Sequence, residues 1–223
     1  MFHRTIVFDL DGTLVDTAPD LCAALNYALA ALDRAPVPAD MVRHMVGHGA
    51  RKLLERGLTA SGPVTPALVE AGVGPFMAYY RAHIADGSRP YPGVERALEA
   101  LAEAGSVVAI CTNKPHELAV GLLEALGWQA RFAAVLGHDS VPAAKPDAGH
   151  VLATLAAAGG VREDAAFVGD SMTDVSAARN AGVPVVAVSF GFSDRPAAEL
   201  GADLVIDHYD QLLPALARVR ALP

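Results

Sequence analysis

A set of polar residues follows short apolar runs of the sequence, and its side chains are of the types that phosphoryl-transfer chemistry uses. The set holds carboxylates, a hydroxyl, an amide and a lysine, at Asp9, Asp11, Thr112, Asn113, Lys145, Asp170 and Asp174. Carboxylates that crowd together repel one another and raise one another's pKa values, and a divalent cation relieves that repulsion. Because oxygen ligands favour a hard ion, the carboxylates indicate a Mg²⁺ site.

The remaining members of the set are suited to holding a phosphate. Lys145 offers a point charge, and Thr112 and Asn113 offer hydrogen bonds. Once a metal ion and a lysine draw off negative charge, a carboxylate can attack phosphorus. Asp9 is the hardest carboxylate to explain as a structural residue, because it ends an apolar run where an unpaired charge is costly.

Each of the other residues has an ordinary structural explanation when it is taken alone. Asp11 could serve a turn, and Thr112 could cap a helix. Asp174 could complement a helix dipole, and Lys145 could be a solvated loop lysine. Their occurrence after successive strands favours one shared site over coincidence.

The apolar runs before these residues are typical of parallel strands that are buried on both faces. They lie at 5–8, 107–110, 133–136, 165–168, 185–188 and 204–206. Helical patterns between them stop at Gly105, Gly127, Gly159 and Gly182, as helix C-termini often do. This alternation predicts an α/β fold with a doubly wound, mostly parallel sheet. Ligands bind at the carboxyl ends of the strands in such a sheet, so we expect the polar set to gather there.

One stretch, residues 16–87, holds helical patterns and no convincing strand. Further helices are expected at 41–45, 51–58 and 66–84, after a first one that carries Leu21, Leu25, Leu29 and Leu32 on one face. We therefore expect a catalytic core at 1–15 and 88–223 and a helical cap domain at 16–87. An insert joined by two linkers after the first strand could act as a lid, and the alternative is a helical layer packed rigidly on the core.

The composition limits the partners that are expected. The 223-residue chain has a formal net charge of −8 and a pI of about 5.4, so its surface repels nucleic acid and anionic lipid. Cys22 and Cys111 have no CxxC spacing, which is typical of proteins of a reducing cytosol. No signal peptide or membrane span is recognisable. These features predict a cytoplasmic protein that binds neither nucleic acid nor membrane, and a monomer and a homodimer both remain open.

The string DLDGTLVDT at 9–17 resembles the first signature of the haloacid dehalogenase-like hydrolase superfamily. The dipeptide TN at 112–113 is similar to its second motif, KP at 145–146 to its third, and GDSMTD at 169–174 to its fourth. These motifs occur in the family's order. The resemblance implies a Rossmann-like core, and the helical insert resembles the C1-type cap of the superfamily.

The resemblance also implies a role for each acidic residue. Asp9 would be the nucleophile that becomes an aspartyl phosphate, and Asp11 would protonate the leaving alcohol and later activate water. The carboxylates of Asp9 and Asp170, with the backbone carbonyl of Asp11, would hold Mg²⁺. Asp174 would lie behind these ligands or bind the metal through water.

Two further inferences depend on the resemblance. Thr112 and Lys145 would hold the oxygens of the transferring phosphoryl group. Asp11 argues for phosphoryl transfer over dehalogenation, because an alkoxide leaving group needs a proton donor and a halide does not.

Within the superfamily, the segments at 46–50, 110–115, 185–191 and 202–207 resemble bacterial phosphoglycolate phosphatases. That resemblance implies a small phosphorylated metabolite, 2-phosphoglycolate, as the substrate. Gly47, His48 and Arg51 form a cap segment that could bind its carboxylate. The alternative for this segment is a simple turn between helices, followed by a solvated basic helix start.

Other functions remain open from the sequence. A hydrolase of the same fold could act on pyrophosphate, a sugar phosphate or a nucleotide, and a phosphoglucomutase-type enzyme also uses the paired aspartates. A non-enzymatic phospho-receiver module carries a similar set of side chains, but such modules are shorter and have no helical insert. A nucleotide-dependent oxidoreductase is disfavoured, because neither GxGxxG nor GxxxxGK[ST] occurs in the chain.

Overall fold

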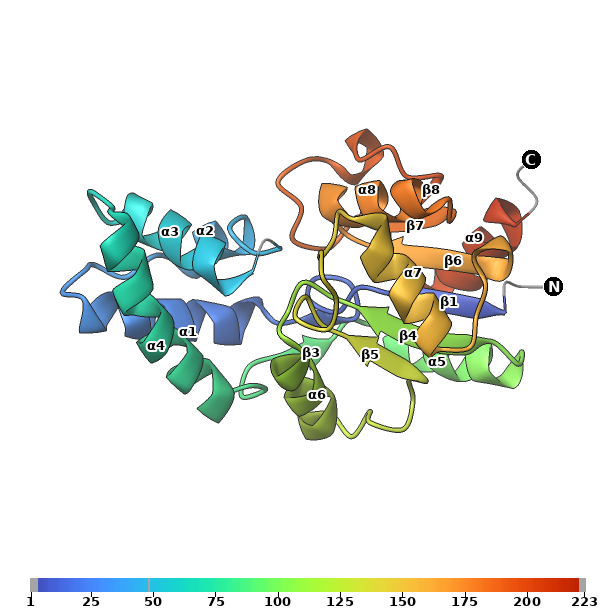
Figure 1. Cartoon of the computed structure of the whole chain (residues 1–223), viewed down its shortest axis with the longest axis horizontal. Helices are drawn as coiled ribbons and strands as arrows, with labels where there is room; N and C mark the ends of the chain where they lie inside the picture. Colours follow the sequence, from blue (N-terminus) through green and yellow to red (C-terminus); the bar gives the residue numbers. More distant parts are fainter. Residues whose placement is uncertain (1–3, 48, 221–223) are drawn as a thin grey trace.

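Residues 4–47 and 49–220 are described in the computed structural model of the chain. A six-stranded parallel sheet runs through it in the order β5-β4-β1-β6-β7-β8 (Figure 1). Its strands are β1 (Thr5–Phe8), β4 (Val107–Cys111), β5 (Ala134–Leu136), β6 (Ala165–Gly169), β7 (Val185–Val188) and β8 (Leu204–Ile206). The predicted fold class and the predicted strands are confirmed.

The sheet is covered by helices on both faces. These helices are α5 (Val94–Glu103), α6 (His116–Ala125), α7 (Ala148–Ala157), α8 (Met172–Ala181) and α9 (Leu212–Val219). Side chains alternate across a strand, so Ile6 and Phe8 join one apolar cluster with α5, α6 and α9, while Val7 joins another with α7 and α8. All three are fully buried. Burial on both faces explains why the strands read as continuous apolar runs.

Helix ends follow the glycines of the sequence. Gly182 caps α8 in the left-handed region, at φ 69°, where a residue without a Cβ is favoured. Within residues 4–220, three short 3₁₀ helices complete the described part of the sheet domain: Arg162–Asp164, Ala197–Glu199 and Tyr209–Gln211. No helix among the described residues is long and apolar enough to cross a membrane.

The insert after β1 is helical, as predicted. Its helices are α1 (Ala18–Ala31), α2 (Ala39–Arg43), α3 (Ala50–Ala60) and α4 (Pro66–Ala82). They pack around an apolar cluster that includes the fully buried Leu25, Leu29, Leu54 and Phe76. Figure 1 shows these four helices as a group set beside the sheet, at the end where β1, β4 and β6 terminate.

Two short strands at the junction with the insert were not expected from the sequence. β2 (Val15–Asp16) and β3 (Arg89–Pro90) pair antiparallel. Each has two residues, which is too short for an alternating pattern to show. Their pairing places the outgoing and returning linkers side by side, so the insert leaves and rejoins the sheet domain at one place.

Candidate active site

The site begins at the carboxyl end of β1, in the middle of the sheet. The chain continues β1 into Asp9, whose N–H donates to the Val168 carbonyl at 2.9 Å, and then turns back. Gly12 lies in this turn at φ 86°, and a Cβ there would stand 2.5 Å from Asp170 Oδ2. The close approach explains why a glycine follows Asp11. The turn therefore lies against Asp170, at the carboxyl ends of the neighbouring strands β1 and β6, where the strand order reverses.

Asp170 follows β6 directly, and both of its oxygens have donors. Thr13 Oγ1 donates to Oδ1 at 3.0 Å, and the Phe192 N–H donates to Oδ2 at 2.6 Å. Asp170 is 3% exposed, so these bonds fix the orientation of its carboxyl group. A carboxylate oxygen has more than one lone pair, so each oxygen keeps the capacity to bind a cation.

Asp174 lies in the first turn of α8, and the backbone around it uses one of its oxygens. Oδ2 accepts from the Ser171 N–H at 3.0 Å, from Ser171 Oγ at 2.6 Å and from the Asp170 N–H at 3.3 Å. Ser171 and Asp174 thereby form a capping box at the start of α8. The other oxygen, Oδ1, accepts from Lys145 Nζ at 2.6 Å.

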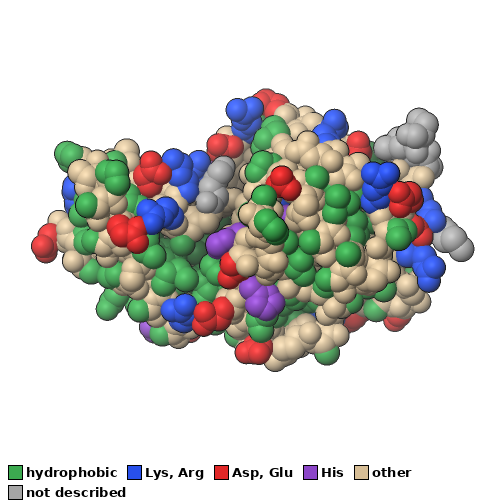
Figure 2. Space-filling model, in the orientation of Figure 1, with side chains coloured by type: hydrophobic (Ala, Val, Ile, Leu, Met, Phe, Trp, Pro, Cys, Tyr) green, Lys and Arg blue, Asp and Glu red, His purple; other side chains and the backbone are tan. Residues whose placement is uncertain are grey.

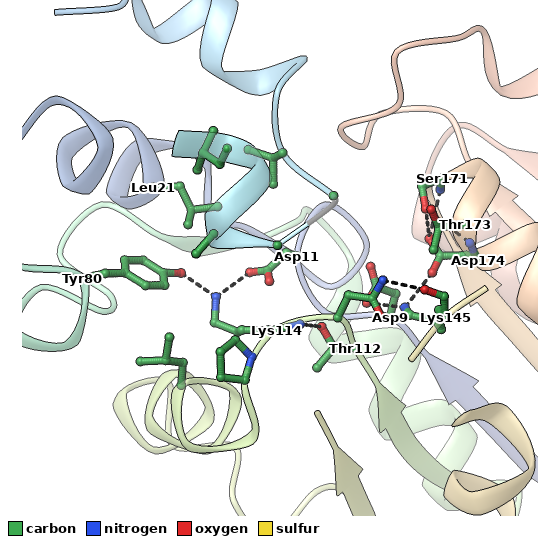
Figure 3. Close-up of a pocket in the computed structure, with 18 of the residues that line it drawn as sticks. Asp9, Asp11, Leu21, Tyr80, Thr112, Lys114, Lys145, Ser171, Thr173 and Asp174 are labelled. Atoms are coloured by element: carbon green, nitrogen blue, oxygen red, sulfur yellow. Dashed lines mark hydrogen bonds and ion pairs between the residues drawn. The ribbon is translucent and has the colours of Figure 1, made fainter. Parts of the chain in front are cut away.

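Lys145 joins the two strand ends. Its Nζ donates to Asp9 Oδ1 at 2.8 Å as well as to Asp174, and its side chain is 2% exposed (Figure 3). The loop that carries it is held by His150, whose Nδ1 accepts from the Lys145 N–H at 3.3 Å. Burial disfavours the ammonium, but Asp174 and Asp9 outweigh it and raise the pKa of Lys145. Lys145 is therefore a permanent cation in the site.

The carboxylates carry more negative charge than the lysine balances. Burial, with a smaller contribution from Asp174, raises the pKa of Asp9 to about 7, although Lys145 acts against this. Burial and the neighbouring carboxylates of Asp174 and Asp9 also raise the pKa of Asp170 well above its ordinary value. Oxygens of Asp9, Asp170 and Asp174 lie within 4.8 Å of one another. This donor set fits a hard divalent cation, which would favour the ionised forms.

Thr112 and Asn113 follow β4, as predicted, and line the same cavity as Asp9 and Lys145. Thr112 Oγ1 accepts from the Lys114 N–H at 3.2 Å, which leaves its hydrogen for another acceptor. Asn113 Nδ2 donates to the Lys145 carbonyl at 3.0 Å. Asn113 Oδ1 is buried and has no hydrogen-bond partner among the described residues. Asn113 thus positions the Lys145 loop.

Lys114 and Tyr80 are members of the site that were not predicted from the sequence. Lys114 Nζ donates to Asp11 Oδ1 at 2.9 Å and to the Tyr80 hydroxyl at 2.5 Å. Figure 3 shows its nitrogen between the two side chains. Asp11 Oδ1 also accepts from Thr17 Oγ1 at 2.8 Å. The sequence signals for Lys114 were its place directly after Thr112 and Asn113 and its position in the segment 110–115, which resembles phosphoglycolate phosphatases. The contact with Tyr80 depends on the packing of α4.

The insert closes the site into a cavity. Its volume, about 60 Å³, is the space that molecules the size of water can occupy. The sheet domain supplies the polar residues already described. The insert supplies Tyr80 and an apolar wall, formed by Leu21, Val46, Leu53 and Phe76. A water molecule needs roughly 10–15 Å³ of such space. The cavity thus suits a molecule of a few heavy atoms.

The predicted cap residues have different positions. Gly47 lines the cavity. Arg51 is not among the lining residues: its guanidinium pairs with Glu70 on the surface, and its side chain is 64% exposed. His48 lies outside the described residues. On the face seen in Figure 2, acidic and basic side chains are interspersed over the insert and do not form one basic patch.

Comparison with known proteins places this geometry among hydrolases. The family model for haloacid dehalogenase-like hydrolases matches residues 3–182. A phosphoglycolate phosphatase of Caulobacter vibrioides is 52% identical, over 92% of this chain and 87% of its own length. A phosphoglycolate phosphatase of Agrobacterium fabrum is 47% identical, over 94% of this chain and 91% of its own length.

Solved structures agree with the sequence comparison. The crystal structure of a predicted phosphoglycolate phosphatase from Haemophilus somnus superposes with a TM-score of 0.89 at 32% identity, covering 96% of this chain and 97% of that one. A putative phosphoglycolate phosphatase from Lactobacillus delbrueckii gives the same TM-score at 26% identity, covering 97% and 99%.

Proposed function

The chain belongs to the haloacid dehalogenase-like hydrolase family, and from this premise we propose that it is a Mg²⁺-dependent phosphatase that hydrolyses 2-phosphoglycolate to glycolate and inorganic phosphate. The observation that carries the proposal is the contact of one buried lysine, Lys145, with both Asp9 and Asp174 beside Asp170. The names of the relatives at 52% and 47% identity support the substrate. The small volume of the cavity agrees with a small ester.

The reaction would proceed in two steps through Asp9. A carboxylate oxygen of Asp9 attacks phosphorus, the ester P–O bond breaks, and Asp11 gives its proton to the leaving glycolate oxygen. Water then attacks phosphorus, Asp11 takes a proton from it, and phosphate leaves with the Asp9 carboxylate restored. Lys145 and the Thr112 hydroxyl would hold the phosphoryl oxygens throughout.

Asp9 and Asp170 would hold the metal by their carboxylates, with the backbone carbonyl of Asp11. Asp174 is better suited to orienting Lys145, because three donors use its Oδ2 and the lysine uses its Oδ1. Four carboxylates face two lysines in the site, and a divalent cation would balance this excess. When bound, the cation would withdraw charge from the phosphoryl group and favour an ionised Asp9.

We divide the chain into a core, residues 1–15 and 88–223, and a cap, residues 16–87, that opens to admit substrate. The apolar cluster of the insert, to which the sheet domain contributes Leu118 and Phe192, and the connection of the chain through the paired strands β2 and β3 support a body that moves as a unit. The two free, buried cysteines and the absence of a membrane-spanning helix among the described residues agree with a cytoplasmic protein.

The test is phosphate release from a panel of small phosphate esters, with Mg²⁺ and with EDTA, by the wild type and by Asp9→Asn. We expect 2-phosphoglycolate to lead the panel, and both EDTA and the substitution to abolish release. Another leading ester, such as a sugar phosphate, would keep the mechanism and overturn the substrate. Conversion of a sugar phosphate to its isomer without phosphate release would indicate a mutase.

A further inference from the structure

Lys114 is a buried cation whose place in the cavity the phosphoryl-transfer chemistry does not explain. Among the described residues that line the cavity, Lys114 and Lys145 carry the permanent positive charges. Lys145 is engaged with Asp9 and Asp174, at the phosphoryl end. We propose that Lys114 binds the carboxylate of the leaving group and so makes the enzyme selective for phosphate esters that carry one. This inference rests on the proposed function and extends it.

The Lys114 ammonium has an unused donor. An ammonium has three N–H groups, and its described acceptors are Asp11 Oδ1 and the Tyr80 hydroxyl. The side chain is 3% exposed, so bulk water does not serve the third N–H. A buried charge with an unsatisfied donor is costly, and a ligand carboxylate that accepts from it removes that cost.

Tyr80 offers a second donor at the same point. Lys114 can only donate, so the Tyr80 oxygen accepts in this contact and its O–H hydrogen remains free. The Tyr80 hydroxyl donates no hydrogen bond to another described residue. Burial raises the pKa of Tyr80 to about 12, so the hydroxyl keeps its proton at neutral pH. The lysine and the tyrosine therefore present two converging donors, which matches the two oxygens of a carboxylate.

The position of Lys114 fits the length of 2-phosphoglycolate. One methylene separates the ester oxygen of this molecule from its carboxylate, so the group that binds the carboxylate must lie beside the group that protonates the ester oxygen. Lys114 Nζ lies 2.9 Å from Asp11 Oδ1, the proposed proton donor. A longer acid would carry its carboxylate past Lys114, and the wall that the insert adds to the cavity is apolar, with Leu21 and Phe76 among its residues.

The test compares 2-phosphoglycolate with ethyl phosphate, which has a methyl group in place of the carboxylate. In the wild type we expect a higher kcat/KM for 2-phosphoglycolate. Lys114→Met keeps the length of the side chain and removes its charge. We expect it to lower the ratio of the two kcat/KM values about 10- to 100-fold, as the loss of a charge-assisted hydrogen bond does. Tyr80→Phe should lower the same ratio by about 2- to 10-fold.

The matched control is Lys52→Met, at an exposed lysine of α3 that pairs with Glu55, and it should leave the ratio unchanged. If Lys114→Met lowered kcat/KM equally for both esters, the lysine would act only through Asp11 and the inference would be wrong. If Lys114→Met does not fold, Tyr80→Phe decides: an unchanged ratio overturns the inference. A wild type without preference for 2-phosphoglycolate would refute the proposed substrate itself, which the ester panel shows independently of Lys114.

Discussion

At the scale of single residues, the site combines groups that the chain brings from distant positions and holds with donors of fixed geometry. Asp170 has two donors on its two oxygens, and Asp174 has donors on both of its own. Such bonds keep side chains in place before substrate arrives, so little reorganisation is needed during the reaction. Asp11 differs in that both of its described hydrogen bonds reach the same oxygen, Oδ1, and come from the side chains of Thr17 and Lys114.

The role of Asp11 as proton donor can be tested by the leaving group. Asp11→Asn should lower kcat/KM for 2-phosphoglycolate by about 10²- to 10⁴-fold, because an alkoxide leaves poorly without a proton. The substitution should lower the rate of the phosphorylation step much less for p-nitrophenyl phosphate, because its phenolate leaves without a proton donor. Stopped-flow measurement of the nitrophenolate burst checks this. An equal loss for both esters would assign Asp11 to another role.

The lowered pKa of His150 predicts how the free energy of unfolding depends on pH. Burial, assisted by the charge of Lys145, lowers its pKa to about 4, from 6.5. Between these values the unfolded chain binds a proton at His150 that the folded protein does not bind, so this residue makes stability fall as the pH falls from 6.5 to 4. In urea unfolding, His150→Gln should show a shallower loss of unfolding free energy over that window. Parallel curves for the two proteins would contradict this.

At the scale of elements, the strands of the large sheet were predictable, and the pairing of the two linkers was not. Buried parallel strands read as unbroken apolar runs, and their carboxyl ends located Asp9, Thr112 and Asp170. β2 and β3 are held by long-range pairing, which no local pattern encodes. Lys114 was missed for the same reason, since its partner Tyr80 comes from a helix 34 residues away.

The return linker is fastened to α1 by Asp20, a buried carboxylate. Its oxygens accept from the Gly87 N–H and the Ser88 N–H, both at 2.7 Å, and from Ser88 Oγ at 2.5 Å. Asp20→Asn replaces one acceptor by a donor that faces an N–H group. We expect the unfolding free energy to fall by about 1–3 kcal/mol, measured by urea denaturation. Asp40→Asn, at an exposed site on α2, is the control and should be near neutral.

At the scale of the whole molecule, the cavity exists because the insert stands over the strand ends. Neither part alone encloses it: the sheet domain supplies the charges and the insert supplies Tyr80 and the apolar wall. The sequence predicted a cap at this place, but it could not show which cap residues reach the site. Arg51 is directed to Glu70 instead, while Val46 and Leu53 line the cavity.

Metal binding should be visible as stability of the whole protein. A ligand that binds only the folded state stabilises it by about 2.7 kcal/mol at a concentration 100 times its dissociation constant. We therefore expect Mg²⁺ to raise the thermal unfolding midpoint of the EDTA-treated protein. Asp170→Asn should remove most of that rise, whereas Asp40→Asn should keep it. A rise of equal size in the Asp170 variant would place the metal elsewhere.

Passage of the phosphoryl group through Asp9 can be tested by trapping the covalent intermediate on this residue. The enzyme is mixed with 2-phosphoglycolate labelled at phosphorus, quenched in acid within milliseconds and digested for peptide mass spectrometry. We expect a label on Asp9 that appears before free phosphate and is absent from Asp9→Asn. Phosphate release with no labelled protein, or a label on another residue, would contradict it.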